Sequence, residues 1–200
     1  MERTAGGRGF GWGGGVRGVR GGRAWRGRGA GVGWLLLGAA LACGCGVAPG
    51  SDAERLARVT TLAVTHDADV PSVPRIAAAD GVGLEPGGVV WVDVRSAAER
   101  AVSGLNGAVT TEAFAAAWAA DPEACAGRRV VAYCTIGRRS GRWAAQQRER
   151  GVNAANLSGG VLAWAHAGGG FVDPAGRATR RVHVYGRAWD LLPAGYVGVR

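Results

Sequence analysis

Three short apolar runs, each followed by a stretch suited to a helix, constrain the fold of this chain most strongly. The runs cover residues 89–94, 130–133 and 154–157, and they are rich in valine and alanine. Continuous apolar runs of this length are typical of strands that a parallel sheet buries on both faces. Helix-compatible stretches follow at 112–120, 141–150 and 161–166. This alternation predicts an α/β fold with a mainly parallel central sheet flanked by helices.

The loop after the second run carries the clearest chemical signal. It reads Cys134, Thr135, Ile136, Gly137, Arg138, Arg139, Ser140. In an α/β sheet such a loop lies at the carboxyl end of a strand, where these folds bind their ligands. Converging backbone N–H groups, a helix N-terminus and two guanidinium groups would form an anion cradle and stabilise a nucleophilic thiolate at Cys134. A buried, inert cysteine beside solvated arginines is the alternative, and the glycine and two arginines within five residues favour the cradle.

At this loop the chain resembles the rhodanese superfamily of sulfurtransferases. The family's active-site loop often reads Cys-x-x-Gly-x-Arg-Ser, and the positions that match are Cys134, Gly137, Arg139 and Ser140. The segment 89–99 is similar to the family's strand ending in Asp-Val-Arg, and 156–164 to its Leu-x-Gly-Gly-x-x-x-Trp segment. The resemblance extends over residues 74–170 and implies one rhodanese-like domain. It has a departure, because Gly104 and Asn106 stand where the family usually has His and Pro.

The resemblance implies a sulfurtransferase that needs no cofactor. Cys134 would take sulfane sulfur from a small anionic donor, thiosulfate or a persulfide, and pass it to cyanide or to a thiol, including a protein thiol. The backbone N–H groups of 135–140 would hold the negative charge of the transferred sulfur. Arg138 and Arg139 would attract the donor, unless one of them ties the loop to Asp93 or Glu99 instead.

Two supporting roles complete this expected site. Arg95 is expected to pair within the domain and so to serve the structure, and Asp93 is expected to be a second supporting residue. Ser140 is expected to cap the following helix and to donate to the cradle.

Two other functions stay open. A cysteine-dependent phosphatase or arsenate reductase of the same superfamily needs an arginine six positions after the cysteine, and that position is Ser140 here. The shorter loop favours sulfur. A non-catalytic binding module usually lacks the cysteine, but the departures at Gly104 and Asn106 keep this interpretation open.

The N-terminal third predicts a leader rather than a domain. Residues 1–33 hold 14 of the glycines with seven arginines and one acidic residue, and they predict a disordered segment. Residues 34–48 are an apolar segment like a signal peptide or anchor, and Cys43 is the candidate for lipidation. We therefore expect export or membrane tethering through this leader, as a lipoprotein, a periplasmic protein or a signal-anchored protein. A cytoplasmic protein is the alternative if translation starts further downstream.

Charge and the remaining segments limit other partners. The net charge is +9, but outside residues 1–33 the chain has 17 arginines against 14 acidic residues, so we expect no nucleic acid partner.

Residues 49–73 predict a linker with a short helix from Ser51 to about Val64, and residues 171–200 a C-terminal extension with a β-hairpin or an edge strand near 179–185. The three histidines lack partners at metal-ligand spacing, so we expect no metal. Cys125 is expected to be a buried apolar residue, with a resolving thiol as the alternative.

Overall fold

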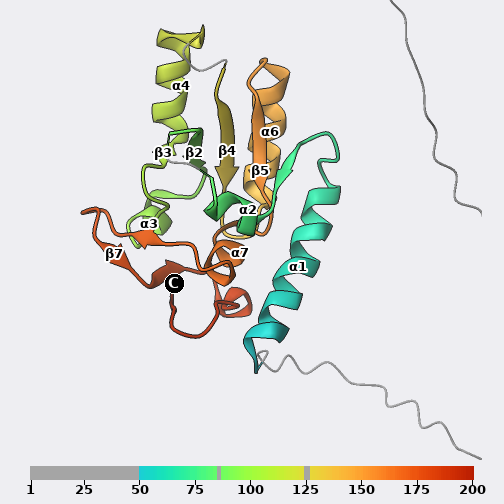
Figure 1. Ribbon diagram of the computed structural model, residues 1–200, viewed down its shortest axis with the longest axis vertical. Helices are drawn as coiled ribbons and strands as arrows, with labels where there is room; N and C mark the ends of the chain where they lie inside the picture. The colour runs from blue at the N-terminus through green and yellow to red at the C-terminus, as the bar shows by residue number, and fades with distance from the viewer. Residues whose placement is uncertain (1–49, 85–86, 124–126) are drawn as a thin grey trace, which may run out of the picture. The chain divides into compact units, whose positions relative to one another are not determined.

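A computed structural model describes residues 50–84, 87–123 and 127–200 of this protein. Its centre is a five-stranded parallel sheet in the order β1-β5-β4-β2-β3 (Figure 1). The strands are β1 (Arg75–Ile76), β2 (Val89–Asp93), β3 (Val109–Thr110), β4 (Arg129–Tyr133) and β5 (Ala154–Leu157). The prediction of an α/β fold with a parallel central sheet flanked by helices is confirmed.

Helices cover both faces of the sheet because successive strand residues point to opposite sides. On one face Val92, Val130 and Ala154 pack with α4 (Thr111–Ala120) and α6 (Arg138–Glu149). On the other face Val131 and Leu157 pack with α2 (Ala78–Val82) and α7 (Gly160–His166). The two faces thus fix which side chain of each strand enters which layer of the core.

Helix α1 (Asp52–Ala68) is longer than the short helix expected in the 49–73 segment. It begins with a capping box between Ser51 and Glu54, and it buries Val59 against the core of the sheet's α7 face. Near its end, Asp67 accepts hydrogen bonds from Asn156 Nδ2 (3.1 Å) and Ser158 Oγ (2.6 Å). These contacts fasten α1 to β5, so this segment packs on the sheet instead of acting only as a linker.

The C-terminal segment differs in part from the hairpin or edge strand expected near 179–185. A small antiparallel hairpin does form, between β6 (Phe171–Val172) and β7 (Ala178–Thr179). The next strand, β8 (Arg181–His183), pairs in parallel with β9 (Val197–Val199) and does not extend the central sheet. Val182, Val184 and Leu191 are buried in the core on the α7 side, so burial of these apolar residues holds the segment there.

The predictions for 1–33 and 34–48, with Cys43, and that for Cys125 lie outside the described residues. Within the described part of the chain, none of the helices is both long and apolar enough to span a membrane. The boundaries drawn at residues 74 and 170 stay predictions.

Candidate functional site

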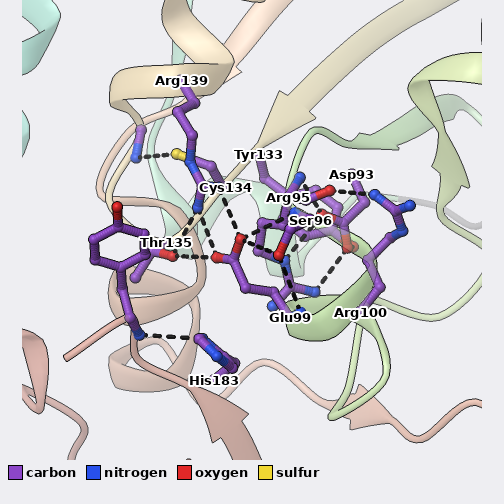
Figure 2. Close-up of polar contacts among 12 residues, drawn as sticks. Asp93, Arg95, Ser96, Glu99, Arg100, Tyr133, Cys134, Thr135, Arg139 and His183 are labelled. Atoms are coloured by element: carbon purple, nitrogen blue, oxygen red, sulfur yellow. Dashed lines mark hydrogen bonds and ion pairs between the residues drawn. The ribbon is translucent and has the colours of Figure 1, made fainter. Parts of the chain in front are cut away.

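Cys134 follows β4 directly and lies at the carboxyl end of the sheet. It is 1% exposed, and its Sγ accepts a hydrogen bond from the backbone N–H of Gly137 at 3.2 Å (Figure 2). Gly137 has φ of 96°, a left-handed conformation that glycine adopts without a steric penalty. This glycine therefore turns the chain back so that its N–H points at the sulfur.

Helix α6 begins at Arg138, three residues before the expected start at Gly141. The expectation that Ser140 caps this helix is wrong, because Gly137 occupies the N-cap position. Ser140 is instead buried in the first turn, and its Oγ donates to Asn156 Oδ1 at 2.7 Å. It ties α6 to β5 and leaves the first N–H groups of the helix, which have no intrahelical acceptor, beside the cysteine loop.

A buried carboxylate fixes the cysteine loop from the side of α3 (Ala97–Arg100). Arg139 donates two hydrogen bonds to Glu99, from Nη1 to Oε2 at 2.7 Å and from Nη2 to Oε1 at 2.6 Å. Thr135 Oγ1 donates to the same carboxylate at 3.0 Å (Figure 2). One arginine was expected to tie the loop to Asp93 or Glu99, and the structure pairs Arg139 with Glu99.

The position of Glu99 comes from a capping box at the start of α3. Ser96 accepts a hydrogen bond from the Glu99 backbone, and its own N–H donates to Glu99 Oε2 at 2.9 Å. Burial raises the pKa of the Glu99 carboxyl, but the hydrogen bonds from Arg139 and Ser96 outweigh it and lower this pKa to about 2. The same bond to Glu99 raises the pKa of Arg139. Both side chains therefore stay charged at neutral pH.

The pair of Asp93 and Arg95 forms a second buried network beside the loop. Arg95 donates to Asp93 from Nε at 2.9 Å and from Nη2 at 2.7 Å, and the Arg95 side chain is fully buried. Asp93 lies next to Tyr133 in register, and the Tyr133 hydroxyl donates to it at 2.7 Å. Burial and the Asp93 charge raise the pKa of Tyr133, which keeps this hydroxyl a donor.

Gly104 lies close beside this network. A Cβ there would lie 3.3 Å from Tyr133 Oη and 3.6 Å from Asp93 Oδ2, inside the buried network. The backbone of Gly104 pairs instead with Val172 of β6 through two hydrogen bonds of 2.9 Å. The departure from the expected family pattern thus coincides with a close contact between the C-terminal hairpin and the loop that follows α3.

The Gly-Gly pair of the 156–164 segment, Gly159 and Gly160, lies next to the cysteine loop, and Gly160 contacts its backbone. Gly160 begins α7 with φ of 53°, and a Cβ there would lie 2.8 Å from the backbone carbon and oxygen of Thr135. Because the glycine permits this approach, Val161 N–H donates to the Cys134 carbonyl at 2.9 Å. The loop backbone is therefore fixed by α7 as well as by α3.

A cavity of about 220 Å³ opens over Cys134. Three groups of side chains line it: the cysteine loop, one residue of α1 and two of the C-terminal segment, in full Cys134, Thr135, Ile136, Arg138, Arg139, His66, Tyr185 and Trp189. Arg138 is exposed and has no hydrogen-bond or ion-pair partner among the described residues. Asp93 and Arg95 do not line this cavity, so they support the site without reaching it.

Sequence reasoning missed three residues of this cavity. His66, Tyr185 and Trp189 lie far from the cysteine loop in the chain, and no local motif marks them. Only the packing of α1 and of the C-terminal segment brings them to the loop. Within the described ranges, no group of three or more His, Cys, Asp and Glu side chains could hold a metal ion.

Residues 83–167 match the family model of the Rhodanese-like domain. No curated protein matches the chain.

Solved structures show distant likenesses. A thiosulfate sulfurtransferase from Pseudomonas aeruginosa is 22% identical, with a TM-score of 0.45 over 60% of this chain and 23% of that one. A rhodanese-like domain protein from Staphylococcus aureus is 23% identical, with a TM-score of 0.40 over 46% of this chain and 91% of that one. A protein of unknown function from Rhodopseudomonas palustris, described as a possible tyrosine phosphatase, is 23% identical, with a TM-score of 0.42 over 62% and 94%.

The low pKa of Glu99 gives a pH-dependent prediction for stability. A carboxyl with a depressed pKa stabilises the fold above its unfolded pKa, near 4.5, and loses this contribution as the pH falls toward 2. Glu99→Gln should lower the free energy of unfolding at pH 7 by about 1.5–3 kcal/mol, because it removes a charged, buried hydrogen-bond acceptor. The gap between wild type and variant should close between pH 4.5 and 2, as measured by urea denaturation.

Glu149→Gln is the matched control, since it removes an exposed glutamate at the end of α6. Its stability should follow that of the wild type across this pH range. A gap for Glu99→Gln that stays constant from pH 7 to pH 2 would contradict the assigned charge of this carboxylate.

Proposed function

Because residues 83–167 are a rhodanese-like domain, we propose that this protein is a sulfurtransferase that carries sulfane sulfur on Cys134. One observation carries the proposal. The cysteine at the strand end faces a cavity that an arginine without a described partner also lines, and the cysteine sulfur accepts a hydrogen bond from a loop N–H. A thiolate at such a position is a nucleophile, and the arginine draws an anionic donor toward it.

In the first half-reaction the Cys134 thiolate attacks the terminal sulfur of thiosulfate. A new S–S bond forms to Cys134 Sγ, the S–S bond of thiosulfate breaks, and sulfite leaves with the electron pair. The product is a Cys134 persulfide that carries one negative charge. The Gly137 N–H, the helix N-terminus behind it and the guanidinium of Arg139 favour negative charge at this place.

In the second half-reaction an acceptor takes the outer sulfur. Cyanide attacks it, the persulfide bond breaks, and thiocyanate leaves while the thiolate of Cys134 is restored. A thiol acceptor reacts in the same way when it attacks as a thiolate, and it leaves as a persulfide.

The two arginines of the loop have different parts in this proposal. Both terminal nitrogens of Arg139 donate hydrogen bonds to Glu99, so this side chain holds the loop and adds positive charge beside the sulfur. Arg138 has an exposed side chain at the cavity and meets the incoming donor. Adjacent residues of a helix point in different directions, which separates the two tasks.

The alternatives fit this geometry less well. Three residues, 135–137, lie between Cys134, which follows β4, and Arg138, the first residue of α6. This tight loop suits a single sulfur atom rather than a phosphate group. A non-catalytic binding module would have no need of a cysteine whose sulfur receives a loop N–H. The binding module is an outcome of the mass-spectrometric experiment described next.

Thiosulfate should add about 32 Da, one sulfur atom, to the purified protein, with Cys134 as the modified residue. Cys134→Ser should lose both this adduct and the formation of thiocyanate, because the hydroxyl is a far weaker nucleophile. Intact mass spectrometry without reducing agent measures the adduct. An unshifted wild-type mass with thiosulfate and with an organic persulfide would overturn the sulfurtransferase proposal in favour of a binding module.

The arginines should separate in a comparison of two alanine variants. Arg138→Ala should raise KM for thiosulfate and leave the free energy of unfolding unchanged, since the side chain has no described partner. Arg139→Ala should lower both kcat/KM, by about 10- to 100-fold, and stability, because it leaves the Glu99 charge without its partner. Steady-state kinetics and urea denaturation test this, and equal, small effects of both changes would show that the roles are misassigned.

We also propose, from the sequence of residues 1–48 alone, that the protein is exported or tethered to a membrane. If Cys43 is lipidated, the mature chain begins at that residue and Cys43→Ala leaves it unprocessed. Mass analysis of the protein from fractionated cells measures this. An intact Met1 in the soluble fraction would refute export and favour an intracellular protein with a Gly/Arg-rich tail.

A further inference from the structure

The outer wall of the cavity over Cys134 is aromatic and comes from the C-terminal segment. Tyr185 lies just after β8, and Trp189 ends the short 3-10 helix η1 (Arg187–Trp189). The backbone N–H of Trp189 donates to the Gly186 carbonyl at 3.0 Å, and the Trp189 ring packs against the core on the α7 side. Packing therefore fixes the Trp189 ring at the mouth of the site, which Tyr185 also lines.

Tyr185 adopts a backbone conformation that its side chain does not favour. Its φ is 66°, and among the described residues it is the only one other than glycine with a positive φ. A non-glycine residue in this region is strained, and such strain gathers where a side chain serves a function. Because 67% of Tyr185 is exposed, burial of its ring does not explain why a tyrosine stands there.

One contact holds the Tyr185 backbone, and a second joins its ring to the cysteine loop. Its backbone N–H donates to His183 Nδ1 at 3.1 Å, a contact drawn in Figure 2. The guanidinium carbon of Arg139 lies 5.8 Å from the centre of the ring, within the range of a cation–π contact. Arg139 thus binds Glu99 with its edge and Tyr185 with its face, so the aromatic wall is fixed to the loop itself.

We propose that this wall makes the site selective for a sulfane-sulfur donor with an apolar carbon part, such as an aryl or alkyl thiosulfonate, over an inorganic donor. This inference rests on the proposed sulfurtransferase function and names its substrate class. A small, strongly hydrated anion gains little from aromatic walls, whereas each methylene group that the wall buries improves binding roughly fourfold. The exposed Arg138 supplies the charge that an anionic sulfonyl group requires, and Tyr185 and Trp189 supply the apolar contact.

The chemistry with such a donor balances without any added oxidant or reductant. The Cys134 thiolate attacks the terminal sulfur of the thiosulfonate, and the bond between that sulfur and the sulfonyl sulfur breaks. The electron pair leaves with the sulfinate, and Cys134 keeps the transferred sulfur as an anionic persulfide. Two negative charges enter the step and two leave it.

The test compares benzenethiosulfonate with thiosulfate as donors for the full-length protein, with cyanide as acceptor. The measured quantity is kcat/KM for benzenethiosulfonate divided by kcat/KM for thiosulfate. Changes in folding or in cysteine reactivity affect both values and therefore cancel in this ratio. Tyr185→Gly and Trp189→Ala should each lower this ratio about tenfold, because the aromatic contact with benzenethiosulfonate is lost. Tyr185→Gly also removes the backbone strain, because glycine adopts a positive φ freely, so this variant should fold at least as well as the wild type.

Trp118→Ala is the matched control. It removes an aromatic side chain from α4, which packs on the opposite face of the sheet, and it should leave the ratio unchanged. A wild-type protein that reacts with both donors, with the same ratio in Tyr185→Gly and Trp189→Ala, would overturn the substrate class and leave the sulfurtransferase proposal standing. Absence of a Cys134 persulfide with either donor would overturn both.

Discussion

The buried carboxylate of Glu99 is the interaction on which the candidate site depends. It accepts two hydrogen bonds from Arg139, one from Thr135 and one from the N–H of Ser96. A buried charge without partners costs several kcal/mol, so the fold must keep these donors in place. The three elements that supply them, α3, the cysteine loop and α6, are thereby held in one arrangement, and the position of Cys134 follows from it.

This arrangement also decides how the two arginines of the loop are used. Arg139 is taken up by the carboxylate on its edge and by the Tyr185 ring on its face, which makes it a fixed positive charge beside the sulfur. Arg138, one position earlier on the same helix turn, points into the cavity mouth and keeps its donors available. In the proposed reaction between anions, the fixed charge beside the sulfur and the free charge at the cavity mouth both counter the repulsion between like charges.

The site is completed by segments from outside the matched domain region. Residues 83–167 contain the sheet's central strands and the cysteine loop, but α1 contributes His66 and the C-terminal segment contributes Tyr185 and Trp189. These segments stay in place through ordinary core packing, in which Val59 and Leu191 are buried against the α7 face. Cys134 therefore lies within the matched region, whereas part of the cavity wall over it comes from residues outside that region.

The sequence by itself determined the parallel α/β class and the place of Cys134 at a strand end, before a short loop with a glycine, because apolar runs and the residues that follow them are local properties of the chain. It left open whether an arginine would bind Asp93 or Glu99, and it assigned to Ser140 a capping role that Gly137 fills. It gave no sign of the aromatic cavity wall or of the parallel pairing of β8 with β9. Only the tertiary structure decided these points, because each depends on how segments far apart in the chain pack together. Such packing is fixed by the burial of a shared core and not by any neighbouring pattern of residues.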